Sequence, residues 1–270
     1  MNIEMIDQLR VVIAIISLIY ASWKDWKTRE IPDFIWVIMS IAGAAFLAVE
    51  IALTIAIIEK LKMLLLMVAF SIIFAFAIGL LLFYLDFFGG ADSKALMALS
   101  ILMPLSPKLE LNMVGNHPFI PVAVFNNSVI MASLMSIVMV IRNLIEKASG
   151  EELFKGLESE NSWKKILAMI TGYKIPATKL KEKQFTYPIE EIEKINGKVI
   201  RKLKIRVGAS AGEENLMRIL EMVEKGEIKD KIWVTPALPM MIFITVGLII
   251  ALIIGDIAFV IALALRQAIH

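Results

Sequence analysis

The sequence predicts an all-α polytopic membrane protein with six transmembrane helices and a small α+β cytoplasmic insert between the fifth and sixth helices. Three observations support this prediction. The 270-residue chain is 59% apolar, well above the roughly 45–50% of ordinary soluble domains. The apolar residues gather in runs, most of them near the about 20 residues that a spanning helix needs. Most of the charge lies in one segment late in the chain.

Six apolar runs predict the spanning helices. The first ends in Tyr20, Trp23 and Trp26, which is typical of an aromatic belt at a membrane interface. The fourth is short for a span and is halted by Pro104 and Pro107. In chain order, the predicted spans are residues 5–23, 34–58, 63–85, 95–105, 122–145 and 236–265.

The charged segment, residues 146–231, predicts a water-soluble α+β insert. Apolar and basic residues alternate over 198–207, as in a half-buried strand, and residues 185–192 are expected to pair with it across Asn196-Gly197. Residues 212–227 predict an amphipathic helix. The predicted domains are residues 1–145, 146–232 and 233–270.

The short hairpin after the first span predicts the orientation. It holds Lys24, Lys27 and Arg29 within a few residues, and basic residues of short loops favour the cytoplasmic side. Six spans place this hairpin, residues 86–94 and the insert on one face. We therefore expect a multi-pass protein of the cytoplasmic membrane with that face in the cytoplasm.

The residue types present restrict the chemistry. The chain has no Cys and two isolated His residues, so a thiolate nucleophile and Cys-ligated zinc are excluded and a His-based metal site is not favoured. We expect no metal, no cofactor and no nucleic-acid partner. Carboxylates are left as the candidates for chemistry.

Two aspartates are predicted to lie at the same membrane depth. Asp25 ends the first span and Asp92 begins the fourth, so two crossings separate them. Two carboxyl groups in contact share a proton, because both cannot ionise at low cost. Such a pair supplies an acid and a base that activate water without a metal. Gly89, Gly90 and Ala91 precede Asp92 and would permit a sharp turn and the close approach of a peptide backbone.

Structural interpretations compete with this one. Asp92 can simply cap the fourth helix, and Asp25 can be a solvated charge of the hairpin. Lys94 is expected to snorkel. Glu50 and Asp256 lie in apolar runs, where ionisable groups default to functional candidates, but we expect both to snorkel at the far interface.

Two motifs resemble those of a known family. Gly89-Gly90-Ala91-Asp92 resembles the GxGD motif of membrane aspartyl proteases, and Asp25 followed by Ile31-Pro32-Asp33 resembles the second motif of type IV prepilin peptidases. Span order, the late insert and the phrase IWVTPALP (residues 232–239) resemble the archaeal preflagellin peptidases in particular. Two motifs in order, each on its expected junction, make the resemblance fairly specific.

The resemblance implies a function. Asp25 and Asp92 would be the catalytic dyad, and the substrates would be archaellin or pilin precursors, cleaved at their class III signal peptides on the cytoplasmic face of the bilayer. Ala91 departs from the motif's second Gly, and the cysteine-bearing segment of many bacterial members is absent. The prediction is therefore limited to peptidase activity, without N-methylation.

Three other functions stay open on the sequence alone. One is a presenilin-type intramembrane protease, which would cut inside the substrate's helix. Another is an ion-coupled transporter with Glu50, Asp92 and Asp256 as relay groups, although these acids do not cluster at the midplane where transporters bind. The third is a membrane scaffold whose insert binds a partner.

Overall fold

The computed structural model describes residues 2–85, 87–107, 117–195, 198–204, 209–228 and 230–269. The chain forms two compact units. The first comprises residues 1–132 and 239–270, and the second comprises residues 133–238. The predicted domain limits, 145/146 and 232/233, stay a prediction.

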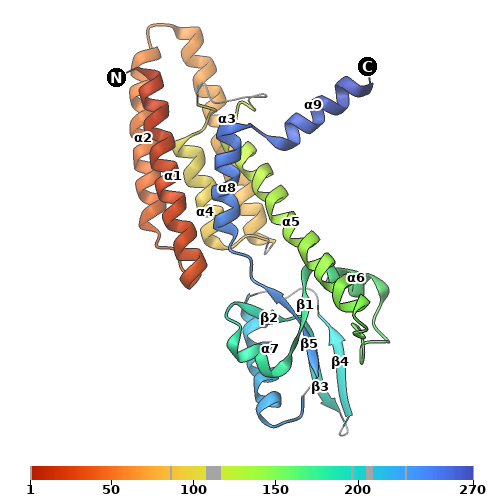
Figure 1. The fold of residues 1–270 in the computed structure, drawn as a ribbon. Coiled ribbons are helices and arrows are strands. Elements are labelled where there is room, and N and C mark those ends of the chain that lie inside the picture. The colour runs from red at the N-terminus through yellow and green to blue at the C-terminus, as the bar shows by residue number, and fades with distance from the viewer. Residues whose placement is uncertain are drawn as a thin grey trace. The chain divides into compact units, whose positions relative to one another are not determined.

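The first unit is a bundle of helices (Figure 1). The short α4 packs against both α2 and α3, and α1 packs against α2 and α8. Their shared core includes the fully buried side chains of Leu18, Met39, Leu99 and Leu248. The helices of this unit are α1 (Ile3–Thr28), α2 (Phe34–Thr54), α3 (Ile58–Tyr84), α4 (Gly90–Leu102), the first part of α5 (Ile120–Ala148), α8 (Met240–Ile253) and α9 (Ile257–Ile269).

Three helices are long and apolar enough to cross a membrane, namely α2, α3 and α5, and a fourth span results if α8 and α9 are counted as one bent span. The chain is therefore a mostly helical membrane protein, but the predicted six spans are not confirmed among the described residues. The fourth predicted run forms only the 13 residues of α4, well short of the about 20 that a span needs.

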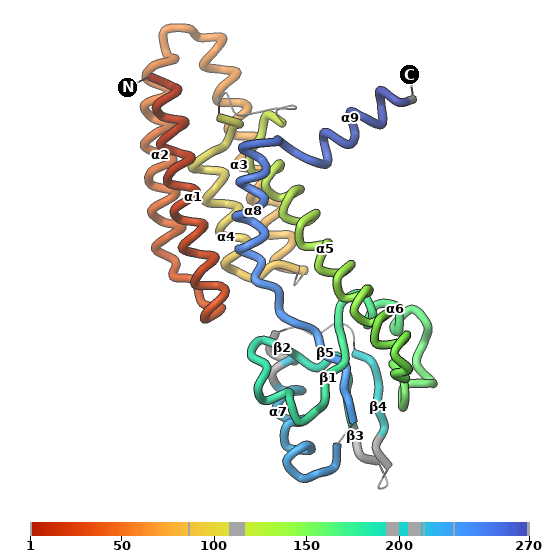
Figure 2. The backbone as a smooth tube through the Cα atoms, in the orientation of Figure 1, coloured from red at the N-terminus to blue at the C-terminus, as the bar shows by residue number. Residues whose placement is uncertain are grey.

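The sixth predicted run is broken rather than continuous. The bend between α8 and α9 is 49°, and Figure 2 shows the abrupt change of direction. The Asn127 amide fixes this break: its Nδ2 donates to the Gly255 carbonyl at 3.0 Å, and its Oδ1 accepts from the Ile257 amide at 3.0 Å. Asp256 caps α9 by accepting from the Phe259 amide. Sequence hydropathy did not reveal the break, because Ile254 and Gly255 continue the apolar run.

The second unit contains the sheets. A three-stranded antiparallel sheet has the order β1-β5-β2, and β3 pairs with β4 in a separate antiparallel hairpin. Its elements, besides the end of α5, are α6 (Ser162–Thr171), β1 (Tyr173–Pro176), the 3₁₀ helix η1 (Ala177–Glu182), β2 (Thr186–Pro188), β3 (Glu190–Ile195), β4 (Lys198–Leu203), α7 (Ala209–Glu224) and β5 (Lys231–Pro236). The predicted amphipathic helix is confirmed as α7, and the predicted hairpin is confirmed in part as β3–β4. Of the expected first strand, residues 185–192, only 190–192 pair with β4; residues 186–188 form β2 and pair with β5 instead. The Asn196-Gly197 turn lies outside the described residues.

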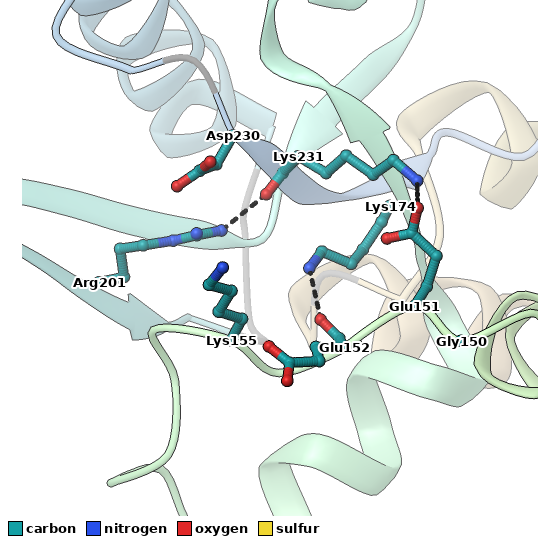
Figure 3. Close-up of a pocket in the computed structure, with 8 residues that line it drawn as sticks. All are labelled: Gly150, Glu151, Glu152, Lys155, Lys174, Arg201, Asp230 and Lys231. Carbon is teal, nitrogen blue, oxygen red and sulfur yellow. Dashed lines mark hydrogen bonds and ion pairs between the residues drawn. The ribbon is translucent and has the colours of Figure 1, made fainter.

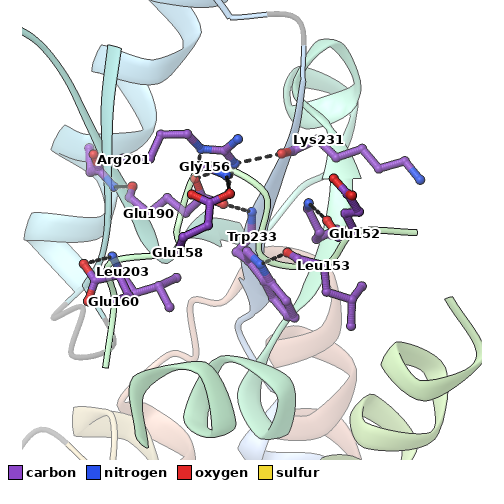
Figure 4. A network of polar contacts seen from close by, with 12 residues as sticks. Glu152, Leu153, Gly156, Glu158, Glu160, Glu190, Arg201, Leu203, Lys231 and Trp233 are labelled. Atoms are coloured by element: carbon purple, nitrogen blue, oxygen red, sulfur yellow. Dashed lines mark hydrogen bonds and ion pairs between the residues drawn. The ribbon is translucent and has the colours of Figure 1, made fainter. Parts of the chain in front are cut away.

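A buried ion pair joins the hairpin to the sheet. Glu190 is fully buried and accepts two hydrogen bonds from Arg201, at 2.7 and 2.8 Å, and one from the Trp233 amide at 2.7 Å. Arg201 also donates to the Lys231 carbonyl, as Figure 4 shows. Burial raises the pKa of Glu190 above its ordinary value, although Arg201 and the Trp233 amide both lower it.

Candidate active site

Asp25 lies in the last turns of α1 and is held against the beginning of α8. Its side chain is almost buried, and Oδ2 accepts a hydrogen bond from the Met241 amide at 3.2 Å. Met241 is the second residue of α8, where free amides and the helix dipole favour a negative charge. The Ser22 hydroxyl reinforces this junction by bonding the Met241 carbonyl and the Thr245 hydroxyl. The α8 N-terminus thus stabilises negative charge on Asp25.

Arg29 closes the end of α1 in an uncommon conformation. Its φ of 57° and ψ of 12° place it in the left-handed region, which costs a non-glycine residue about 1–2 kcal/mol. Its backbone amide donates to the Asp25 carbonyl, and its Nη1 lies 3.3 Å from Asp25 Oδ1. The guanidinium therefore holds the side of the Asp25 carboxylate that Met241 does not.

Asp92 occupies the third position of α4. Its Oδ2 accepts a hydrogen bond from the Gly89 amide at 3.0 Å, which satisfies one exposed donor at the start of the helix. The capping role that competed with a functional one is thus observed. Only one oxygen of the carboxyl group is used in this way, so capping and acid–base chemistry are compatible.

Burial raises the pKa of Asp92 from 3.8 to about 6, and the negative charge of Asp25 adds to this rise. The Gly89 hydrogen bond and the positive charge of Arg29 act in the opposite direction. Asp92 precedes the apolar run that begins at Ala95, so it lies outside the candidate spans. The charges of Asp25 and Arg29 reach Asp92 because α1 and α4 pack against each other. The structure therefore brings both aspartates to one end of the first unit.

The glycines before Asp92 contribute by their small size rather than by an unusual backbone. Gly89 has φ −67° and ψ 160°, which any residue adopts, so the predicted need for glycine at a sharp turn is not observed there. A Cβ on Gly89 would lie 3.1 Å from Asp92 Oδ2, whereas one on Gly90 would make an ordinary 3.7 Å contact with the Phe83 ring. Ala91 is partly buried against the core.

The other acids named in the sequence analysis, Asp33, Glu50 and Asp256, each have a hydrogen-bond or ion-pair partner. Asp33, at the start of α2, does not cap that helix; it accepts two hydrogen bonds from Lys94 at 2.7 and 2.9 Å. This pair is exposed, and it replaces the snorkelling expected for Lys94.

The expectation that Glu50 and Asp256 snorkel is wrong. Glu50 pairs with the buried Arg10 at 3.0 Å. Asp256 is 1% exposed, and its Oδ2 accepts a hydrogen bond from the side-chain Nδ2 of Asn126 at 2.8 Å. Both acids are neutralised or hydrogen-bonded inside the first unit, as buried polar groups must be, so the relay of a transporter gains no support from them.

Two members of the site were missed in the sequence. The Met241 amide, 216 residues from Asp25, carries no sequence signal because any residue supplies a backbone donor. Arg29 carried one, since it follows Asp25 by four residues, the spacing of helical ion pairs. It was interpreted only as a charge that fixes orientation.

A different kind of pocket lies in the second unit. It has a volume of about 400 Å³ and is lined by charged side chains of both signs (Figure 3). Lys231 is paired with Glu151, and the buried Lys174 donates to the Glu152 carbonyl. Desolvation lowers the pKa of Lys174. Each of these contacts joins a cation to an oxygen, so this pocket does not hold two carboxyl groups that share a proton.

The described residues contain no group of three or more His, Cys, Asp or Glu side chains arranged to hold a metal ion. The candidate site of the first unit consists of two carboxyl groups (Asp25 and Asp92), the Arg29 guanidinium and the backbone amides of Gly89 and Met241.

Comparison with known proteins defines the class. Residues 12–137 match the Type IV leader peptidase family, and residues 164–257 match the archaeal peptidase A24 C-terminus, type II. The two matches lie in both units, and the chain is similar to the type IV leader peptidase family, whose members are proteases. The resemblance that the two motifs indicated is thereby confirmed.

Three relatives share the name preflagellin peptidase. That of Methanococcus maripaludis (strain C6) is 28% identical, and the alignment covers 91% of this chain and 94% of the relative. That of Methanocaldococcus jannaschii is 26% identical over 91% of this chain and 93% of the relative. That of Methanococcus voltae is 26% identical, and the alignment covers 90% of this chain and 94% of the relative.

Proposed function

We propose that the chain is a membrane aspartic endopeptidase that cleaves the class III signal peptides of archaellin or pilin precursors. Asp25 and Asp92 form its catalytic dyad. The observation that carries the proposal is the packing of α1 against α4, which brings these two carboxyl groups, one from each motif, to one end of the first unit. The negative charge of Asp25 adds to the raised pKa of Asp92 there. The three relatives named preflagellin peptidase support the archaellin precursor as the substrate.

The contacts of the two aspartates suggest a division of roles. The Arg29 guanidinium and the Met241 amide stabilise negative charge on Asp25, so Asp25 is the base that takes a proton from water. Asp92, with a pKa of about 6, holds the proton that passes to the scissile carbonyl oxygen as water attacks the carbon. When the tetrahedral intermediate collapses, the proton on Asp25 goes to the leaving amine and Asp92 recovers its own. No metal is needed in this cycle.

The substrate would approach along Gly89, Gly90 and Ala91. None of the three carries a side chain longer than a methyl group, so an extended peptide can come close to the Asp92 carboxyl. Lys24, Lys27 and Arg29 at the same end of α1 favour the cytoplasmic side of the bilayer. The proposed cut therefore falls at the cytoplasmic membrane surface, between the leader and the apolar helix of the precursor.

The test is processing of a precursor archaellin by membranes that contain the protein. Asp25→Asn and Asp92→Asn should each reduce the processing rate by about 100-fold or more, since positioned acids and bases contribute 10²–10⁴-fold. Asp33→Asn is the matched control, because it changes an exposed carboxylate at the same end of the bundle. Unchanged processing by both dyad variants would remove the proposal. A cut inside the apolar helix would instead favour a presenilin-type protease.

A further inference from the structure

Arg29 has a conformation that the helix end alone does not explain. A left-handed residue after the last turn of a helix is usually glycine, which adopts it without strain. Here that position, with φ 57°, holds an arginine whose side chain is only 22% exposed. Unfavourable backbone conformations persist where the surrounding structure requires them, and they concentrate at functional sites.

The left-handed turn directs the guanidinium to the Asp25 carboxylate. Both halves of Arg29 bind the same residue: the backbone amide bonds the Asp25 carbonyl, and Nη1 lies 3.3 Å from Oδ1. Oδ2 is held by Met241 of α8. The carboxylate is thus fixed from two sides, and its orientation relative to α4 is set by Arg29 and α8 together.

Among the described residues, few ionisable groups lie around Asp92. From α1 they are Asp25 and Arg29, which act on it with opposite signs. On α3, which packs against α4, the ionisable side chain at the C-terminal end is the exposed Tyr84. On α4 itself Lys94 is turned to Asp33 of α2, and α8 contributes no ionisable side chain at its start. Burial and the Gly89 hydrogen bond have the largest effects on the pKa of Asp92, and the opposite charges of Asp25 and Arg29 then adjust it.

We propose that Arg29 is a positioning residue of the dyad: it orients the Asp25 carboxylate and biases the shared proton between Asp25 and Asp92. This inference rests on the proposed function, because it assigns a role within the same site. Arg29 acts through Asp25 and need not touch the substrate.

The experiment measures precursor processing against pH for four variants in membranes. Arg29→Gly removes the guanidinium but suits the left-handed backbone, so the end of α1 should be retained while the rate falls about 10- to 100-fold. Arg29→Gln should do the same to the rate, and Arg29→Lys should restore part of it. Lys27→Gln is the control, since Lys27 is an exposed cation of the same turn that lies over the Trp23 ring.

The pH profile distinguishes positioning from a structural role. Arg29 lowers the pKa of Asp92, so its loss should move the profile's apparent pKa upward, whereas Arg29→Lys and Lys27→Gln should leave it in place. The apparent value belongs to the coupled pair rather than to one residue. Wild-type rate and profile in both Arg29→Gly and Arg29→Gln would overturn this inference alone. If Asp25→Asn and Asp92→Asn also processed normally, the proposed function itself would fail.

Discussion

Each of the two units buries acidic side chains, and the units differ in how many cations accompany these acids. In the second unit Glu190 has a cation of its own: Arg201 bonds it twice and the Trp233 amide bonds it once. In the first unit two acids share one cation, because Arg29 contacts Asp25 and only its charge reaches Asp92.

On the proposed function, this difference separates an acid that stabilises the fold, Glu190, from the two acids assigned to catalysis, Asp25 and Asp92. A buried carboxylate with a bidentate partner has a settled charge and cannot exchange its proton without breaking the pair. Two carboxyl groups with one cation between them have a proton whose position depends on small electrostatic changes. That condition is what acid–base catalysis requires. We therefore expect changes to Glu190 to act on stability and changes to Asp25 or Asp92 to act on rate.

The largest expected stability effect comes from breaking the Glu190 pair. Arg201→Met leaves a fully buried acid without its cation, which should cost about 3–5 kcal/mol. Because burial already raises the pKa of Glu190, the loss should be greatest at high pH and should shrink as the pH falls and Glu190 takes up a proton. Hydrogen exchange of the Trp233 backbone amide measures this loss of stability. Lys204→Met, which removes an exposed ion pair with Glu191, should have little effect.

Asp92→Asn should stabilise the protein while it inactivates it. The folded pKa of about 6 exceeds the ordinary 3.8, so the contribution of Asp92 to stability is complete below about pH 4 and is lost as the pH rises through 6. Asn keeps the oxygen that accepts from Gly89 but does not ionise. Thermal unfolding at pH 7 should therefore favour the variant by an amount on the order of 2 kcal/mol. Equal stability of both proteins from pH 4 to pH 7 would contradict the raised pKa.

The glycine pair offers a finer comparison. A Cβ on Gly89 would lie 3.1 Å from Asp92 Oδ2, so Gly89→Ala should displace the carboxyl by a few tenths of an ångström and reduce processing about tenfold. Gly90→Ala meets only the Phe83 ring at 3.7 Å and leaves the Asp92 carboxyl in place, so it should reduce processing less than Gly89→Ala. Initial rates in membranes with matched expression provide the comparison; equal rates for the two variants would show that the Asp92 position tolerates the shift.

The smallest effect is expected at Lys94. Its pair with Asp33 is exposed, and such pairs contribute about 0–1 kcal/mol. Lys94→Met should lower the unfolding free energy by no more than about 1 kcal/mol and should leave the processing rate within a few-fold of wild type. A fall in processing rate as large as that of Asp92→Asn would mean that Lys94 takes part in the chemistry of the site.

Local sequence patterns predicted the parts of the fold that local interactions decide. The apolar runs predicted α1, α2, α3 and the apolar part of α5, and the alternation after residue 198 predicted β4. The β1-β5-β2 order was not predictable, because β5 lies more than 40 residues from both partners and short strands carry little signal. The break between α8 and α9 was missed for a similar reason, since it depends on Asn127, 128 residues before Gly255.

The site shows the same limit. Asp25 and Asp92 were recognisable because each lies in a short motif at the end of an apolar run. The two groups that contact Asp25 were not recognisable in the sequence. The Met241 amide is a backbone group, and Arg29 became informative only through its left-handed backbone conformation. Glu50 was misjudged because its partner, Arg10, is 40 residues away on another helix.

The most direct test of the account is a double-mutant cycle on the dyad. Processing rates of Asp25→Asn, Asp92→Asn and the double variant are compared in the same membranes. If the two carboxyl groups share one proton and act as a unit, the double variant is no slower than the slower single variant, because catalytic groups that work together are strongly non-additive. Losses that multiply, with the double variant slower by the product of both factors, would show two independent residues and contradict the dyad.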